Sequence, residues 1–471
     1  MTTSAIGSAI DVGSIVSQLM AVERQPLTAL QKSISGIQTK LSAFGKVQGQ
    51  LSTFQDAAKE LFALDTWRSA QATSSDETAA KATASTGAIP GSYDLTVTQL
   101  AQRQTLSTGA LASGDVVVGG GTMRVQLGTY ASVGNTFTAN PDKPEVSITI
   151  AAGSTLSQVR DAINSADPGV SASLVNDGTG VRLVIRSEQT GLSNVARISV
   201  TDDDGNSTDT TGLSSLSHDP TLAAGAGKNL TETQAAQNAL LSVSGIAVSS
   251  PTNQVEGLIE NVTLDVRKAG TGTINIGVAY DGAAMRKSVE KFVSAWNDLN
   301  KTLTDQTKYD ATSKAAGPLQ GNNTVLGMQR QLRATLQAAT SGTGIARLSD
   351  AGLEVQRDGS LTIKSSKFDA LLTTPSKLKT LFGASSTTDP NAVGIARRLD
   401  SLVTGILGSE GAVTSATTAL RTRQTSVQAQ QTRFESRMTQ IEARLIKQYT
   451  ALDKNMAGLN TTSSYLSSQF G

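Results

Sequence analysis

Residues 434–466, FESRMTQIEARLIKQYTALDKNMAGLNTTSSYL, carry apolar side chains at intervals of seven. One row consists of Met438, Leu445, Leu452, Leu459 and Leu466, and the interleaved row of Leu420, Val427, Phe434 and Ile441. Two such rows are the a and d positions of a coiled coil, where a helix meets a partner helix. Each leucine left in water would forgo ~1.5–3 kcal/mol, so this face requires a partner. Pairing is weakened by polar residues at four row positions, Gln424, Gln431, Gln448 and Asn455.

The N-terminal end of the chain repeats this pattern. Its rows are Met20, Leu27, Ile34 and Leu41, and Leu30, Ile37, Phe44 and Leu51. We therefore predict helix from residue 12 to about 64, with a break near Pro26, because proline fits the first turn of a helix. From both ends we predict one coiled-coil partner interface, formed by Leu27, Leu30, Ile34, Ile37, Leu41, Phe434, Met438, Ile441, Leu445, Leu452, Leu459 and Leu466.

The middle of the chain has a different residue pattern. From residue 76 to about 280, short alternating runs are separated by turn signals such as Asn176-Asp177-Gly178, which predicts β-strands. A short helix is expected at 155–165, and helix dominates again from 283. The predicted fold is α+β and multidomain, with terminal helices forming a coiled-coil or helical-bundle stalk and two β-rich domains inserted between them. The expected divisions are 1–42 with 425–471 (coiled coil), 43–75 with 281–424 (helical bundle), 76–118 with 236–280 (inner β-rich), and 119–235 (outer β-rich).

The composition narrows the functional classes. The net charge is +1, which gives no overall positive charge that would indicate nucleic-acid binding. Only 4% of the residues are aromatic, so a ligand pocket lined by aromatic side chains is not expected. No stretch approaches the ~18–20 apolar residues of a membrane span. The basic residues of the C-terminal arm are expected to form a solvated coiled-coil flank, with nucleic-acid binding as the weaker interpretation.

Export is suggested by what the sequence lacks. The 471 residues include no cysteine, which suits a protein exported by a route that disulfides would obstruct, although chance is an equal explanation. The first twenty residues have neither a basic n-region nor a continuous apolar h-region, so an extracellular location would require export without a cleaved leader.

Candidate catalytic and metal-binding residues are few. The single histidine, His218, lies between Ser217 and Asp219, but no G-x-S-x-G motif accompanies it, so we expect an exposed loop histidine. Asp202 and Asp204 resemble the start of a calcium loop that lacks its later ligands, and a solvated acidic turn is expected there. The glycine-rich stretches 119–121 and 225–228 lack phosphate-loop spacing and are expected to be flexible turns. We predict no enzyme activity, no cofactor and no metal site.

Several motifs together resemble the flagellar filament-capping family, hook-associated protein 2. The resemblance spans nearly the whole chain, in the same order and spacing. The motifs are Gly7-Ser8-Ala9-Ile10-Asp11-Val12, Ser42-Ala43-Phe44-Gly45, Tyr93-Asp94-Leu95-Thr96-Val97, Ala172-Ser173-Leu174-Val175, Phe292-Val293 with Trp296-Asn297, and Tyr449-Thr450-Ala451-Leu452-Asp453. Thr155-Leu156 through Ser187 is similar to the insertion motif that flagellins and hook-associated proteins share. Ala9-Ile10 stand where the family more often has Gly-Leu.

The resemblance implies a function and a set of partners. The protein would form a homo-oligomeric ring at the distal tip of the extracellular flagellum, prevent flagellin leakage, and promote flagellin folding and polymerisation. Its partners would be further copies of itself, flagellin, hook–filament junction proteins, the type III flagellar export apparatus and a dedicated export chaperone. Two alternatives stay open: an adhesin whose β domains bind host mucin or glycan, and another axial junction protein. Activity of isolated β domains would favour adhesion, whereas loss of activity on deleting 438–471 would favour the cap.

Overall fold

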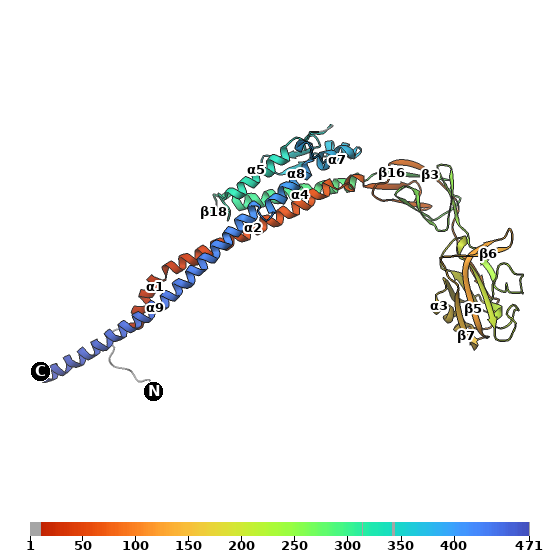
Figure 1. Ribbon diagram of the computed structural model, residues 1–471, viewed down its shortest axis with the longest axis horizontal. Coiled ribbons are helices and arrows are strands. Elements are labelled where there is room, and N and C mark those ends of the chain that lie inside the picture. Colours follow the sequence, from red (N-terminus) through yellow and green to blue (C-terminus); the bar gives the residue numbers. More distant parts are fainter. Residues whose placement is uncertain (1–10, 313, 342–343, 471) are drawn as a thin grey trace. The chain divides into compact units, whose positions relative to one another are not determined.

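The computed structural model describes residues 11–312, 314–341 and 344–470, and it confirms an α+β multidomain fold. Residues 7–10 of the N-terminal motif lie outside the described residues. The chain forms two compact units, of which the first comprises Met1–Trp67 with Gly282–Gly471 and the second Arg68–Asp281. No helix among the described residues is long and apolar enough to cross a membrane. Figure 1 shows both units and labels some of their helices and strands.

Helices form most of the first unit. They are α1 (Val12–Glu23), α2 (Gln25–Phe62), α4 (Gly282–Thr307), α5 (Asn323–Gln337), α6 (Ser365–Leu372), α7 (Pro375–Gly383), α8 (Ile395–Leu407) and α9 (Ala412–Phe470). Two small hairpins connect them, β17 (Tyr309–Asp310) with β18 (Ala315–Ala316), and β19 (Leu353–Val355) with β20 (Leu361–Ile363). The predicted helix break is confirmed, because α1 ends before Arg24 and Pro26 occupies the first turn of α2. A proline is tolerated there because its missing N–H has no partner in the first turn.

The core of this unit lies where α2, α4, α7 and α8 pack together. Phe54 of α2 contacts Phe292 and Trp296 of α4, with ring centroids 5.3 and 5.5 Å apart. Trp67 stacks on Phe382 of α7 at 5.6 Å. These large rings are fully or almost fully buried, and they supply much of the apolar area that holds the bundle together.

The second unit contains a β-sandwich made of two antiparallel sheets. The larger sheet has the order β1-β16-β3-β12-β13, and the smaller has the order β14-β15-β2. The strands are β1 (Ala70–Ser74), β2 (Ala80–Ala84), β3 (Gly91–Gln99), β12 (Ala239–Val243), β13 (Ile246–Ser250), β14 (Gln254–Ile259), β15 (Val262–Val266) and β16 (Thr273–Tyr280). Alternating residues such as Leu95, Val97 and Ile276 are buried between the sheets, as period-two patterning requires.

The rest of the second unit, residues 105–234, has its own core. Strand β5 (Val117–Ala131) pairs with β10 (Val195–Asp202), β6 (Thr136–Ala139) and β7 (Val146–Thr155), while β11 (Thr231–Gln234), β4 (Thr105–Ser107), β9 (Val181–Ser187) and β8 (Val170–Asn176) form a second sheet. Helix α3 (Leu156–Ala166) packs on β7 and β8. Its predicted start is confirmed, because Thr155 and Gln158 form a reciprocal capping box.

Two local expectations in this region were wrong, and a third was wrong in part. His218 is buried (1% exposed), and its ring Nδ1 lies 3.2 Å from the Leu230 backbone oxygen. Asp202 is buried, and its carboxylate accepts hydrogen bonds from the backbone N–H groups of Ser214 and Asp204, whereas Asp204 is exposed in a turn, as expected. The stretch Gly119-Gly120-Gly121 lies inside strand β5. In each case, long-range pairing orders a segment that local composition marks as loop.

Candidate functional site

The candidate site is the pair of terminal helical segments, and its first part is a small core between α1 and α9. Val16 and Met20 of α1 are buried with Met438 of α9. Around them lie half-buried apolar side chains of both helices, namely Val12, Phe434, Ile441, Leu445 and Tyr449. Val12 and Val16 were not among the predicted seam residues, although their spacing of four, continued by Met20, is a helical signal that could have indicated them.

The first half of α2 also lies along α9, and it carries the other predicted seam residues. Ile37 is buried, whereas the remaining four, Leu27, Leu30, Ile34 and Leu41, are half-buried. An ion pair of 3.4 Å joins Arg24, immediately before α2, to Glu442 of α9. Both side chains are about half exposed, so this ion pair adds little stability.

Along α9 the contact row departs from a seven-residue repeat after Leu445. The side chains that face α1 are Phe434, Met438, Ile441, Leu445 and then Tyr449, so the interval from Met438 to Tyr449 is eleven residues. Eleven residues in three turns correspond to ~3.67 residues per turn, close to a straight helix, whereas a strict heptad requires a left-handed supercoil. The row that faces the neighbouring helix therefore turns away from Leu452.

The last three predicted seam leucines are exposed, and they follow Tyr449, the last residue of α9 in the core with α1. Leu452, Leu459 and Leu466 are 45%, 63% and 49% exposed. Figure 1 shows the C-terminal end of α9 extending beyond the start of α1. The predicted seam residues from Phe434 to Leu445 therefore contact the N-terminal helices. The three leucines that follow form an exposed row without a partner helix among the described residues.

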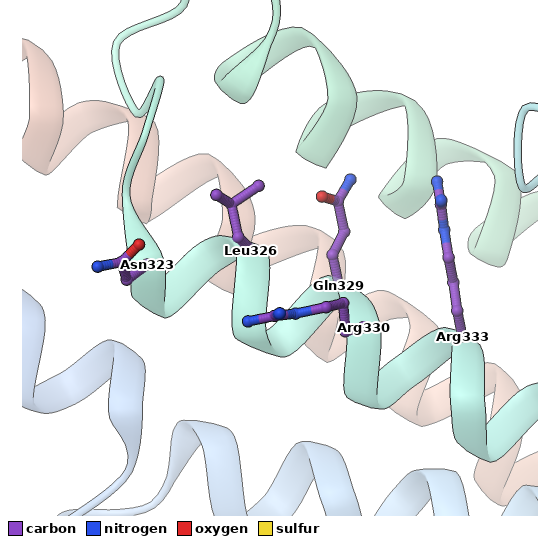
Figure 2. Close-up of a pocket in the computed structure, with 5 residues that line it drawn as sticks. All are labelled: Asn323, Leu326, Gln329, Arg330 and Arg333. Carbon is purple, nitrogen blue, oxygen red and sulfur yellow. The ribbon is translucent and has the colours of Figure 1, made fainter.

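Three features of the described residues bear on the chemistry of the chain. No group of three or more histidine, aspartate or glutamate side chains there could hold a metal ion. Burial lowers the pKa of His218, and its ring interacts with a backbone oxygen of the same buried loop. An open pocket on α5 is lined by Asn323, Leu326, Gln329, Arg330 and Arg333 (Figure 2). Its side chains include neither a nucleophile nor a general base.

Three segments of the chain match described protein families. Residues 8–104 match the flagellar hook-associated protein 2 N-terminus, and residues 236–461 match its C-terminus. Residues 132–189 match the flagellin hook IN motif. These matches include α1, α2, the β-sandwich, α9 as far as residue 461, and part of the 105–234 region.

Relatives of known name match almost the whole chain. A flagellar hook-associated protein 2 of Escherichia coli strain K12 is 32% identical over 99% of this chain and 97% of its own length. An A-type flagellar hook-associated protein 2 of Pseudomonas aeruginosa is 31% identical over 98% of this chain and 95% of its own. The crystal structure of the D1-D2-D3 domains of the flagellar cap protein FliD from Escherichia coli aligns with a TM-score of 0.64 and 31% identity, over 80% of this chain and 99% of that chain.

Proposed function

The chain belongs to the flagellar hook-associated protein 2 family, and on that basis we propose that it acts as the filament cap through its exposed terminal helices. Its role is that of a structural cap at the distal tip of the flagellum, where it works as an oligomer. None of the relatives named above favours the adhesin or the junction-protein alternative.

The observation that carries the proposal is the uncovered leucine row of α9. Leu452, Leu459 and Leu466 recur every seven residues and are about half exposed. Covering such side chains contributes up to ~1.5–3 kcal/mol each, so the row favours a helical partner. Flagellin subunits at the filament end would supply such helices. The terminal helices would then act as legs that dock between flagellin subunits, hold the cap at the tip and retain each incoming subunit until it folds.

The four-part division expected from the sequence is also proposed for the functional organisation. Four separate hydrophobic clusters support it. They centre on Met20 with Met438, on Phe54 with Trp296, on Leu95 with Ile276, and on Met123 with Ile163. The cluster that contains Met20 is much the smallest, which suits a segment that orders fully only on docking. The two β-rich parts would form the plate above the legs.

Export through the flagellar type III channel fits the same features. A chain without cysteine cannot form disulfides that would obstruct passage through a narrow channel. A dedicated chaperone would cover the apolar row of α9 before export, because that row would otherwise associate non-specifically in the cell. We also propose that the protein has no enzymatic activity and that it contacts hook–filament junction proteins.

The test is a strain that lacks this gene, complemented by the wild-type chain or by an empty vector. We expect the deletion strain to release monomeric flagellin into the medium and to carry short or absent filaments, and complementation to restore both. Normal filaments without the gene would contradict the cap role. Normal filaments combined with lost surface attachment would indicate an adhesin instead.

A further inference from the structure

The outward face of α2 carries mostly small side chains over three turns, although the exposed Lys46, four residues after Ser42 and seven before Thr53, shares this side of the helix. Ser42, Gly45, Gly49 and Thr53 recur every three or four residues and are all exposed, opposite the buried Phe44 side of the helix. A Cβ atom added at Gly45 or Gly49 would meet nothing within 4 Å. Glycine inside a helix lowers its stability relative to alanine, and no contact within the described chain explains either glycine. A flat helix face of this kind lets another helix approach closely.

This small-residue face continues into a groove between α2 and α4. Its charged and small lining residues are Asp56, Ala57 and Glu60 of α2, and Lys291, Ala295 and Asp298 of α4. The two alanines keep the groove floor shallow. Three carboxylates line the groove with one ammonium group, and Lys59 beside it lies 3.9 Å from Asp56, which leaves one carboxylate in excess. Lys291 and the Ser288 hydroxyl bind Glu60, whereas Asp298 is exposed and has no ion pair among the described residues.

Helix α5 presents the complementary surface. Its outward face carries Gly327, Arg330 and Ala334, and Leu326 beside them is 37% exposed. A Cβ atom at Gly327 would again meet nothing within 4 Å. The helix has two arginines and no acidic residue, and Arg330 makes no ion pair within the described part of the chain. Figure 2 shows Leu326, Gln329, Arg330 and Arg333 projecting from α5 around the open pocket.

We propose that the outward face of α5 in one copy of this protein docks onto the α2–α4 face of a neighbouring copy. Small residues would meet small residues, with Gly327 and Ala334 against Gly45 and Gly49. The Arg330 guanidinium would lie near the unpaired Asp298 carboxylate of the neighbour. The lengths also match, because α5 spans ~22 Å and the α2 face from Ser42 to Glu60 spans ~27 Å.

Such a contact would build a ring and not a closed pair. The two faces share no lining residue, so one copy can use its α5 while its own groove receives the next α5. A contact between two different faces is head-to-tail, and repeated head-to-tail contacts close into rings when the rotation permits. The inference rests on the cap being an assembly of several copies, and its test uses purified full-length chains without flagellin, so it can fail independently of the cap role.

Disulfide trapping tests the contact directly, because the natural chain has no cysteine to interfere. One full-length variant carries Gly49→Cys and the other Ala334→Cys. Under mild oxidation, the mixture should give a covalent dimer that contains one chain of each kind, since a disulfide forms only when Cβ atoms approach to ~3.5–4.5 Å. Each variant alone should stay monomeric on a non-reducing gel. A dimer formed by Gly49→Cys alone would overturn the head-to-tail arrangement.

Substitutions at the two faces test the energetics by sedimentation. Gly49→Leu should weaken self-association about tenfold or more while α2 folds normally, since the side chain enters open space within its own copy. Gly36→Leu is the matched control: Gly36 is also exposed with nothing within 4 Å, but it lies on the other side of α2. Arg330→Glu should weaken association roughly fivefold, and adding Asp298→Arg should restore it.

Three results would overturn the proposal. The first is a wild-type chain that does not self-associate at any accessible concentration. The second is unchanged association of Gly49→Leu together with reduced binding to flagellin, which would assign the α2–α4 face to a flagellin helix. The third combines two observations. Asp298→Arg fails to restore the self-association that Arg330→Glu weakens, and Lys301→Glu, an exposed charge change on α4 outside the groove, weakens self-association as much as Arg330→Glu does.

Discussion

The indole Nε1 of Trp296 donates a 2.8 Å hydrogen bond to the backbone oxygen of Gly359, which fastens the β19–β20 turn to α4. Two neighbours on α4 complete this attachment. The Asn297 amide pairs with both the N–H and the oxygen of Leu361, and Asn300 donates to the Asp358 oxygen. The polar backbone of the hairpin is thereby satisfied inside an apolar core, where an unpaired group would cost about 1–3 kcal/mol.

Replacing Trp296 with phenylalanine should therefore destabilise the helical bundle. The variant loses the hydrogen bond to Gly359 and part of the packing on Phe54, with an expected loss of about 2–4 kcal/mol in unfolding free energy. Urea unfolding followed by fluorescence measures it, because the remaining tryptophan, Trp67, lies in the same core. Tyr309→Phe, at a half-exposed position on the β17–β18 hairpin, is the control and should change little. An unchanged midpoint for Trp296→Phe would contradict this account.

Elements whose cause is local could be predicted from the sequence. The β8–β9 hairpin follows from Asn176-Asp177-Gly178, because glycine takes the positive φ that a tight turn requires. Helix α3 follows from its cap at Thr155 and from the apolar face of Leu156, Val159 and Ile163. In both cases the deciding residues lie within a few positions of each other, so no knowledge of distant partners is needed.

Features that depend on distant partners could not be predicted in this way. His218 is buried because its backbone pairs with Ile198, twenty residues earlier, in a bridge that no local pattern indicates. The seam residues show the same limit. Their heptad spacing can be read from the sequence. Which of them contact α1, however, depends on the number of residues per turn of α9. In the structure Tyr449 lies against α1, whereas Leu452 is exposed.

His218 should make the 195–230 region sensitive to acid. Burial lowers its pKa below the ordinary 6.5, with Lys228 acting in the same direction, while the Leu230 oxygen, Glu232 and Asp219 partly oppose the shift. The unfolded chain therefore binds more protons than the folded chain between the two pKa values, so stability rises with pH through that range and falls on acidification from ~7.5 to ~5.5. Amide hydrogen exchange across residues 195–230 at the two pH values measures the change.

The control for this pH dependence is His218→Gln, which keeps a polar side chain but cannot titrate. Exchange rates in the same segment, corrected for the intrinsic effect of pH, should then differ little between the two pH values. Equal protection of the wild-type segment at both pH values would contradict a lowered pKa of His218 in the folded chain. The variant itself is expected to be less protected overall, because its side chain does not reproduce the fit of the imidazole against Leu230.

Gly121→Ala should destabilise the region around β5. At this position β5 is paired with β7 on one side and β10 on the other, and φ is +140°. An added Cβ would collide with the backbone oxygen of Thr201, so a strand must shift, at an expected cost of about 2–4 kcal/mol. Hydrogen exchange of β5 and β10 is the measurement. Gly109→Ala is the control, since a Cβ there meets nothing within 4 Å, and equal effects of the two variants would contradict the steric explanation.

The double variant Leu452→Asp with Leu459→Asp should keep its fold and lose cap function. Both leucines are exposed on the distal part of α9, so two aspartates lower helix propensity by only about 0.5 kcal/mol each and disturb no described core. Thermal unfolding followed by circular dichroism should be nearly that of the wild type. In the deletion strain, the variant should leave flagellin monomers in the medium and filaments short, because charged side chains cannot enter the apolar contact with a partner helix.

The matched control for this variant is Thr450→Asp with Thr461→Asp, which adds the same charge to the opposite side of α9 at two exposed positions and should complement the deletion. An immunoblot of the medium for the variant itself separates loss of docking from loss of export, since an export defect would leave the variant inside the cell. Exported variant, leaking flagellin and a functional control together would assign docking to the leucine row. Normal filaments in the Leu452→Asp, Leu459→Asp strain would instead exclude this row from the contact and move the docking surface to the α1–α9 core around Met438.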